Sequence, residues 1–451
     1  MDFDRALKFL DEHTSLDGHR GDRFSLDAGT TGKTRVAMDL PEAGQTDGLS
    51  LDPMRKLLDA LGQPQNAYRT VHITGTNGKG STARYLSSLL KASGLSVATY
   101  TSPNIERINE RLCWDGEPIS DEEFGRVIGL LAAVEPLIDV TPSRFELLTA
   151  AAFVWFADLG ADVAVIEVGM LGRFDATNVI DADVAVITNV GKDHTSGGEG
   201  WRELVASEKA GIIKPSSHLV LGFDPGELGP IFAAENPRAT WVAGTDFRVD
   251  ANNLAVGGRL ADITTPHGNH DEIFVPFHGA HQAQNFANAL ASYEAFFDRK
   301  AEQDVIVSAL DDVSLPGRFE VVGTRPTVIL DGAHNPDGAR SAYRTLVDEF
   351  ARMGSWVLVV GLVGNKDPVE MLEAFNASSF DAVICCEPDW SRRVSADRVA
   401  AAADKLGIVA EVVKDPVVAL ERALAVTAEE DLILVGGSIY VIGEIKSELR
   451  R

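Results

Sequence analysis

The stretch Val71–Leu86, VHITGTNGKGSTARYL, decides the fold class of this chain. The apolar run TVHI passes directly into a glycine-rich loop, and a helical pattern with one apolar face follows from about Lys79 to Ser93. In such a strand–loop–helix unit, glycines let backbone N–H groups turn inward and the helix N-terminus adds positive potential, which favours phosphate binding. The general pattern places Ser or Thr directly after the lysine, whereas here Gly80 separates Lys79 from Ser81. We predict a phosphate loop in which Lys79 neutralises phosphate charge and Ser81 reaches Mg²⁺; the alternative is a tight turn with a solvated lysine.

Strand patterns alternate with helical patterns along most of the chain, which indicates a parallel α/β architecture. The strand runs LSVATY, ADVAVIEVG and ADVAVITNV are apolar almost throughout, as expected when helices cover both faces of a sheet. Between about Val220 and Phe277, short strands and turn residues predict a β-rich insertion, and a long helix over GAHQAQNFANALASYEAFF follows. The alternation restarts after a segment ending in LPGRFE, so we predict a domain boundary near Ser314.

The length and composition of the chain limit the classes of function that it can have. A chain of 451 residues is long enough for two or three domains. Its net charge of −26 argues against nucleic acid and anionic membrane as partners. The three cysteines, Cys113, Cys385 and Cys386, lack C-x-x-C spacing, which indicates a reducing compartment and no disulfide framework or zinc site. With neither signal-peptide features nor a long apolar run, the sequence predicts a cytoplasmic protein.

Polar residues gather where the predicted strands end. Glu167 lies near the end of ADVAVIEVG, Asp193 and His194 follow the next strand, and Ser102 follows a third. Carboxyl ends of parallel strands meet at one edge of a sheet, and Mg²⁺ takes oxygen ligands while keeping waters. A glutamate inside an apolar strand is costly unless it is paired or binds metal. We predict a magnesium site beside the phosphate loop; the alternatives are a salt-bridged Glu167 and a locally hydrogen-bonded His194.

The C-terminal half repeats this arrangement in TVILDGAHNPDGA. A buried strand ends in Asp331, and His334 and Asn335 precede a helix that begins with proline. Asp331 and His334 are candidates to hold a nucleotide across a domain cleft; the alternative is helix capping by Asp331 or Asn335. Arg318 and Asn285 are unremarkable when each is taken alone.

Nine sequence blocks occur in one order: GTNGKGS, TSPNIERINER, SRFELLTAAAF, EVGMLGRFDATN, GKDHT, SEKAGIIKP, HQAQNFANALA, PGRFE and DGAHNPDGA. Together they resemble the folylpolyglutamate synthase/dihydrofolate synthase branch of the Mur ligase superfamily, from about Leu51 to Gly443. The resemblance implies an α/β protein with an N-terminal P-loop ATPase domain of the Mur-ligase type (residues 1–313) that carries the pterin/folate site. A C-terminal Rossmann-like glutamate ligase domain (residues 314–451) would follow.

The implied activity is ATP-dependent ligation of L-glutamate to dihydropteroate, to reduced folyl-polyglutamates or to both, through an acyl phosphate and with release of ADP and phosphate. The implied cofactors are ATP, two Mg²⁺ ions and, as a further option, K⁺; the implied state is a monomer. Three alternatives remain open from the sequence: elongation of folates only, a Mur-type ligase acting on a cell-wall precursor, and a nucleotide-binding module without catalysis.

The resemblance also assigns roles to residues. The implied ATP contacts are Thr76, Asn77, Gly78, Lys79, Gly80, Ser81, Asn285, Arg318, Asp331 and His334. The implied metal ligands are Ser81, Ser102, Glu167 and His194, with Lys209 carbamylated to support the second metal. The implied catalytic residues are Lys79, Glu167, His194, Lys209 and His334. The implied pterin site comprises Phe145, Glu146, Arg173, Phe174 and Asp175, with Thr46, Asp47, Gly48 and Leu49 as a weaker match.

Two points of the sequence stand apart from these assignments. By sequence alone Lys209 would be a surface partner of Glu208, so its metal role depends wholly on the resemblance. Leu171 occupies the position of the first of two paired glycines in the family pattern. The pterin loop is therefore the part of this sequence that departs most from the family pattern.

Overall fold

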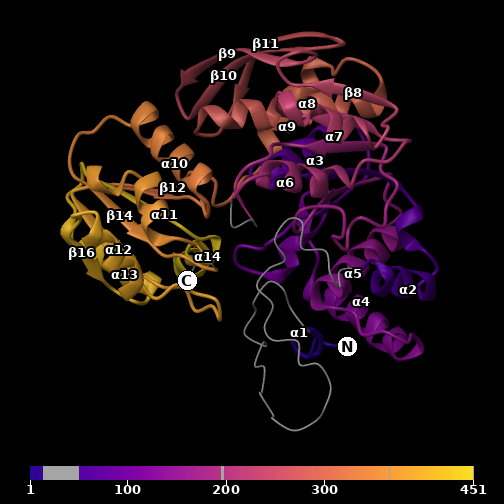
Figure 1. Ribbon diagram of the computed structural model, residues 1–451, viewed down its shortest axis with the longest axis horizontal. Coiled ribbons are helices and arrows are strands. Elements are labelled where there is room, and N and C mark those ends of the chain that lie inside the picture. Colours follow the sequence, from indigo (N-terminus) through magenta and orange to yellow (C-terminus); the bar gives the residue numbers. More distant parts are fainter. Residues whose placement is uncertain (14–49, 194–197, 365, 450–451) are drawn as a thin grey trace. The chain divides into compact units, whose positions relative to one another are not determined.

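The computed structural model describes residues 1–13, 50–193, 198–364 and 366–449 (Figure 1). These residues form two compact units that interleave along the chain. The first unit comprises residues 1–103, 109–246 and 288–301, and the second comprises residues 104–108, 247–287 and 302–451. The second unit therefore contains segments from both sides of the predicted boundary near Ser314, whereas the first unit lies wholly before it.

The first unit is built on an eight-stranded sheet of order β4-β3-β2-β5-β1-β6-β7-β8. Strand β1 lies at its centre and pairs in parallel with both β5 and β6. Nearly every residue of these three strands is buried, which explains their unbroken apolar character. The strands are β1 (Arg69–Thr74), β2 (Val97–Tyr100), β3 (Leu112–Trp114), β4 (Glu117–Pro118), β5 (Val163–Glu167), β6 (Val184–Ile187), β7 (His218–Leu221) and β8 (Ala239–Val242).

Helices cover this sheet. α3 packs on β1, β2 and β5, while α6 and α7 share an apolar core with β6 and β7. The helices are α1 (Phe3–Asp11), α2 (Asp52–Ala60), α3 (Lys79–Ala92), α4 (Asp121–Val134), α5 (Arg144–Leu159), α6 (Trp201–Ala210) and α7 (Gly229–Ala233), with short 3₁₀ turns η1 (Pro64–Asn66), η2 (Ile108–Arg111), η3 (Glu135–Leu137) and η4 (Gly226–Leu228).

The second unit contains a six-stranded sheet of order β12-β13-β17-β14-β15-β16 and a three-stranded antiparallel sheet of order β11-β10-β9. In the larger sheet only β12 runs antiparallel to its neighbour. The strands are β9 (Arg248–Ala255), β10 (Gly258–Thr265), β11 (Gly268–Val275), β12 (Glu320–Thr324), β13 (Thr327–Leu330), β14 (Trp356–Val360), β15 (Ala382–Cys385), β16 (Ala410–Val412) and β17 (Leu432–Gly436).

Helices cover both faces of the six-stranded sheet, as in a doubly wound fold. One apolar cluster joins the sheet to α10, α11 and α12, and a second joins it to α13 and α14. The helices are α9 (Gln303–Asp312), α10 (Pro336–Glu349), α11 (Pro368–Ala374), α12 (Ala396–Lys405), α13 (Pro416–Val426) and α14 (Ile439–Leu449), with η5 (Ala377–Ser379). Helix α8 (Ala280–Phe297) begins in the second unit, and its residues from Asn288 onward belong to the first.

The parallel α/β class predicted from the sequence is confirmed. The β-rich insertion is narrower than predicted, because β7 and β8 belong to the main sheet and only residues 248–275 form a separate sheet. The boundary between residues 313 and 314 stays a prediction; by contacts, residues 247–287 and 302–313 group with the second unit. Among the described residues, no helix is both long and apolar enough to span a membrane.

Candidate active site

The loop between β1 and α3 has the geometry that phosphate binding requires. Gly78 has a φ of +81° and is the N-cap of α3, a left-handed conformation that favours glycine. A side chain at Gly75 would lie 1.8 Å from Thr188 Oγ1, so glycine is needed there for close packing. The loop therefore turns tightly and delivers the first amides of α3 at the end of β1.

Residues after β6 hold this loop in place. The side-chain oxygen of Asn189 accepts hydrogen bonds from the N–H groups of Thr76 and Asn77, both at 3.0 Å. Thr188 donates its hydroxyl to the Asn77 carbonyl oxygen at 2.6 Å. The sequence analysis missed Thr188 and Asn189, although their position directly after an apolar strand was a usable signal.

The glycine that interrupts the general pattern faces the predicted metal ligand. A Cβ added to Gly80 would lie 3.4 Å from Glu167 Oε2, at van der Waals contact distance, so the Gly80 backbone lies directly beside this carboxylate. Glu167 and Ser81 are both buried, and the Ser102 N–H donates to Glu167 Oε2 at 3.1 Å. The structure thus brings together Gly80, Glu167 and Ser102 at the start of α3. Lys79 Nζ donates to the Gly75 carbonyl oxygen at 3.1 Å and lies over the same loop.

These groups fit a hard divalent cation. The Glu167 carboxylate and the hydroxyls of Ser81 and Ser102 are oxygen donors, and Mg²⁺ binds through few protein oxygens while keeping several waters. Among the described residues, which do not include His194, no three His, Cys, Asp or Glu side chains cluster in a way that could hold a metal. The chemistry of the donor set, with a single buried carboxylate, therefore suits magnesium bound to a nucleotide.

Lys209 is buried on α6, not a surface partner of Glu208 as the sequence alone suggested. Burial and, to a smaller extent, the nearby charge of Lys79 lower the pKa of Lys209 to about 7, although Asp193 opposes the shift. A large fraction of this amine is therefore neutral near neutral pH. Glu208 is also buried, and burial raises its pKa against the effect of Arg173.

The predicted pterin residues lie on two segments of the first unit. Arg173 and Phe174, on the loop after β5, line a cavity of about 550 Å³ together with Arg55 and Lys214. The aromatic ring of Phe145, on α5, lies against Gly169, where an added Cβ would be 2.4 Å from it. Thr46, Asp47, Gly48 and Leu49 lie outside the described residues. The cationic pair Arg55 and Lys214 was missed by sequence reasoning, which gave no signal for it.

Glu146 has a structural contact at the start of α5. Its side chain accepts from the Ser143 N–H at 2.6 Å, and the Ser143 hydroxyl accepts from the Glu146 N–H at 3.3 Å. This reciprocal pair is a capping box.

The second unit holds the remaining predicted residues. Asp331 accepts from the N–H groups of Phe319 and Ala333, both at 2.8 Å. Arg318 lies beside the adjoining Gly332: a Cβ added to this glycine would be 3.4 Å from Arg318 Nη1. Burial raises the pKa of Asp331, and the charge of Arg318 counteracts this.

Two further contacts in this unit bear on the predictions. His334 contacts the Gly332 carbonyl oxygen at 3.0 Å, and Asn335 caps α10 by accepting from the Gly338 N–H at 2.9 Å. Helix capping thus belongs to Asn335, not to Asp331. Asn285 is buried on α8 and donates to Gln282 at 3.2 Å. Arg318, Asp331 and His334 lie close in sequence and structure, whereas the phosphate loop belongs to the first unit.

Comparisons with known families agree with this architecture. The family model described as Mur ligase middle domain matches residues 73–293, and that described as Mur ligase, glutamate ligase domain matches residues 317–439. These two matches cover the phosphate loop and the Asp331 region respectively.

Individual relatives are similar over most of their length. A dihydrofolate synthase/folylpolyglutamate synthase of Mycobacterium tuberculosis (strain ATCC 25618 / H37Rv) is 38% identical over 381 residues, which cover 78% of this chain and 77% of that protein. The structure of Mycobacterium tuberculosis folylpolyglutamate synthase complexed with ADP and AMPPCP has a TM-score of 0.84 at 34% identity, covering 89% of this chain and 96% of that one. A bifunctional folylpolyglutamate synthase/dihydrofolate synthase with Mn, AMPPNP and L-glutamate bound has a TM-score of 0.83 at 26% identity, covering 100% and 98%.

Proposed function

The chain belongs to the dihydrofolate synthase/folylpolyglutamate synthase family of Mur ligases, and from this premise we propose that it ligates L-glutamate to dihydropteroate or to reduced folates at the expense of ATP. The observation that supports this most directly is the phosphate loop Gly75–Ser81, which lies against the buried carboxylate of Glu167. The relatives that bind an ATP analogue, Mn and L-glutamate support the same substrate set.

The proposed reaction needs no protein nucleophile. A carboxylate oxygen of the acceptor attacks the γ-phosphorus of ATP, the bond to the bridging oxygen breaks, and ADP leaves. The amine of L-glutamate then attacks the acyl carbon, phosphate leaves with the electron pair of the C–O bond, and the amine loses a proton. Positioning and charge stabilisation supply most of the rate in such transfers.

The residues of the first unit have assigned parts in this chemistry. Lys79, which now donates to the Gly75 carbonyl oxygen, exchanges this contact for the transferring phosphoryl group. Ser81, Ser102, Glu167 and His194 would hold magnesium, which would neutralise phosphate charge when bound. The amide groups of Gly78, Gly80 and their neighbours would bind the phosphates, and Asn189 holds Thr76 and Asn77 in place beside them.

We assign Lys209 a carbamate that supports the second metal. Its burial and its pKa of about 7 support this assignment, because only the neutral amine attacks CO₂. Lys209→Ala should therefore lose ligase activity that short-chain carboxylates or high bicarbonate partly restore. Wild-type activity of Lys209→Ala without additives would refute the carbamate role. Comparing ligase activity in Na⁺ and K⁺ buffers tests whether K⁺ is a further cofactor.

We assign nucleotide binding to four further residues as well: Asn285, Arg318, Asp331 and His334. Arg318 supplies positive charge, while Asp331 shapes the turn that carries His334 by accepting from Ala333 and Phe319. Arg318→Ala should raise the KM for ATP more than the KM for glutamate. Monomeric state and cytoplasmic location are also proposals; light scattering tests the first and cell fractionation the second.

The deciding experiment measures ADP release with each substrate omitted in turn. We expect release to require ATP, L-glutamate and a pteridine acceptor together, with dihydropteroate and tetrahydrofolate assayed separately. Activity with tetrahydrofolate alone would indicate folate elongation only. Activity with a UDP-sugar peptide instead would indicate a cell-wall ligase, and acceptor-independent nucleotide binding without turnover would indicate a regulatory module.

A further inference from the structure

The loop of residues 169–178 follows β5 and carries Arg173 and Phe174 into the cavity described above. One of its residues, Leu171, has a φ of +57°. A non-glycine residue in this left-handed region costs about 1 kcal/mol or more and persists only where its surroundings impose it. The contacts that impose this conformation come from β1, the same strand that delivers the phosphate loop.

Two side chains on one face of β1 contact this loop. His72 and Thr74 are two residues apart on a strand, so they point to the same side of the sheet. Thr74 donates its hydroxyl to the Leu171 carbonyl oxygen at 2.5 Å, and His72 Nε2 lies 2.8 Å from Thr177 Oγ1. All three side chains involved, those of His72, Thr74 and Thr177, are inaccessible to solvent.

The hydrogen bonds of Thr177 show which group donates in its contact with His72. Thr177 has a single hydroxyl proton and donates it in a hydrogen bond to Asp175 Oδ1 at 2.5 Å, so its oxygen accepts the hydrogen bond from His72. His72 is therefore the tautomer protonated on Nε2, assigned here from its partners. The buried chain runs from His72 through Thr177 to Asp175.

Asp175 ends this chain within the loop. Its carboxylate accepts from the N–H groups of Met170 at 2.8 Å and Thr177 at 3.0 Å, from the Thr177 hydroxyl, and from the backbone of Gly169. A carboxylate has about four acceptor sites, and the loop itself fills them. Asp175 is therefore placed to shape the loop.

The opposite side of the loop is held as firmly. The Arg173 N–H donates to the Glu208 carbonyl oxygen at 2.8 Å, and Asn178 donates to the carbonyl oxygens of Arg173 at 2.9 Å and Gly211 at 3.0 Å. A Cβ at Gly172 would lie 2.7 Å from the Glu208 carbonyl oxygen, so the loop packs directly on α6. The backbone of Arg173 and Phe174 is thus fixed between β1 and α6.

We propose that one face of β1, through His72 and Thr74, clamps the loop 169–178 and thereby sets the affinity for the acceptor substrate. The proposal extends the function proposed above and depends on it, because the acceptor is the substrate assigned to Arg173 and Phe174. His72, Thr74, Thr177 and Asp175 are positioning residues, since they act on substrate through the loop. The same strand leads into the phosphate loop, so the clamp places the acceptor relative to the phosphate.

The test separates the acceptor from the nucleotide. Thr177→Val keeps the shape of the side chain but neither donates to Asp175 nor accepts from His72. We expect the KM for the acceptor to rise about tenfold, while the KM for ATP stays within about twofold of wild type. Thr177→Ser retains the hydroxyl and should restore the acceptor KM. This rescue would not occur if Thr177 only filled space in the core.

A second variant and a control keep the test decisive. Thr74→Val removes the other contact of the clamp and should raise the same KM. Thr99→Val is the matched control, because Thr99 is also buried in this sheet and donates its hydroxyl to Ser87 at 2.7 Å away from the loop. Should one of the two clamp variants fail to fold, the other decides.

Three outcomes have distinct meanings. An unchanged acceptor KM in a folded Thr177→Val or Thr74→Val protein overturns the clamp, as does an equal rise in the KM values for acceptor and ATP. A rise confined to the acceptor, absent in Thr99→Val, supports it. A wild-type protein that releases no ADP with either acceptor instead refutes the proposed function, which the clamp presupposes.

Discussion

At the scale of single residues, Lys79 is the side chain on which the phosphate-loop interpretation depends most. It lies at the first position of α3, and its Nζ donates to the carbonyl oxygens of Gly75 at 3.1 Å and Thr76 at 3.5 Å. We expect Lys79→Ala to lower ligation by about 10³-fold or more, because charge on the transferring phosphoryl group loses its partner. Thermal unfolding should be nearly unchanged. Lys91→Ala, at the other end of the same helix, is the control; an active Lys79→Ala enzyme would contradict the assignment.

Lys209 gives a second residue-scale prediction, on stability against pH. Its pKa falls from 10.5 in the unfolded chain to about 7 in the folded one. As pH drops between these values, the unfolded chain takes up a proton that the folded chain does not, which favours unfolding. The penalty is absent above the unfolded pKa, grows as pH falls, and is constant below about 7.

Replacing Lys209 by methionine should remove this penalty. In CO₂-free buffer, Lys209→Met should unfold at higher urea concentration than wild type at pH 7, and the gap should close towards pH 10. The gain in unfolding free energy is on the order of 1.4 kcal/mol per pH unit below the unfolded pKa, less whatever relaxation of the buried site recovers. A gap that does not depend on pH would show that folding does not lower the pKa of the Lys209 amine.

These two lysines illustrate what the sequence could and could not predict. The role of Lys79 could be predicted from neighbouring residues alone, because the strand, the glycines and the helix start are adjacent in the chain. Lys209 is followed by a helix end and preceded by Glu208, and nothing nearby in sequence shows that both are buried. Burial depends on the loop 169–178 packing across α6, a contact between distant segments.

At the scale of elements, the start of α5 separates capping from substrate binding. The resemblance assigned Glu146 to the pterin site, and the structure shows it in a capping box with Ser143. We expect Glu146→Ala to lower the free energy of unfolding by about 1 kcal/mol, while Glu146→Gln, which can still accept from the Ser143 N–H, should cost much less. Thermal unfolding measures both, and the acceptor KM of Glu146→Gln tests the pterin assignment. Equal destabilisation by the two variants would contradict the capping role.

The elements themselves were largely predictable because their periods are local. The central strands, α3 and the long α8 all occur where apolar runs or helical patterns predicted them. The Ser143–Glu146 spacing is also a known helix-start signature, and it went unused. Strand β8 was assigned to the insertion because its neighbour in the sheet, β7, lies beyond a turn and a helix and is identified only by pairing.

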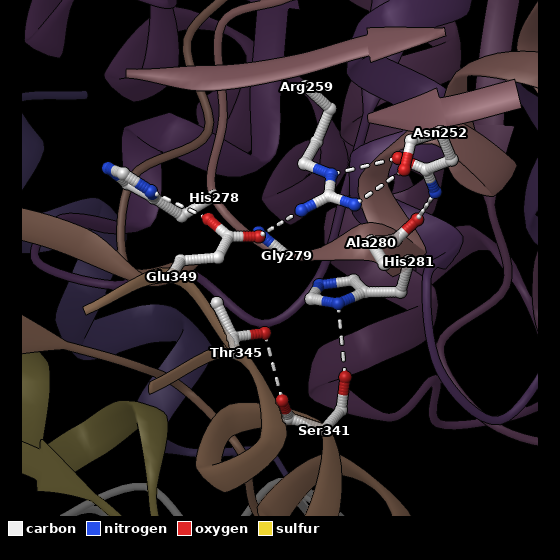
Figure 2. A network of polar contacts seen from close by, with 9 residues as sticks. All are labelled: Asn252, Arg259, His278, Gly279, Ala280, His281, Ser341, Thr345 and Glu349. Carbon is white, nitrogen blue, oxygen red and sulfur yellow. Dashed lines mark hydrogen bonds and ion pairs between the residues drawn. The ribbon is translucent and has the colours of Figure 1, made fainter. Parts of the chain in front are cut away.

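At the scale of the whole molecule, the second unit is assembled from segments far apart in the chain, and a buried carboxylate joins them (Figure 2). Glu349, the last residue of α10, lies 2.9 Å from His278 Nδ1 and accepts from the Gly279 N–H at 2.9 Å and from Arg259 Nη1 at 3.1 Å. Arg259, on β10, also donates to Asn252 on β9. The network therefore ties the three-stranded sheet and the start of α8 to α10, a relation that no local pattern could show.

This network yields the prediction for the whole unit. The Glu349 side chain is 1% exposed, so Glu349→Ala would remove the carboxylate that pairs with Arg259 Nη1 and accepts from the Gly279 N–H, at a cost of about 3–5 kcal/mol in unfolding free energy. Asp348→Ala, at the exposed neighbouring position, should change it by less than about 0.5 kcal/mol.

A double-mutant cycle tests whether these residues act together. Arg259→Ala with Glu349→Ala should cost clearly less than the sum of the single variants, because each single change strands a buried partner that the double change removes. The pH dependence gives an independent check: burial alone would raise the pKa of Glu349, but His278, Gly279 and Arg259 outweigh it and lower the pKa. The stabilisation is therefore complete above the unfolded pKa and is lost as pH falls through the folded one. Urea unfolding at pH 7 and below pH 4 measures both effects, and additive single-variant costs with no change on acidification would mean that the three segments are held together by apolar packing instead.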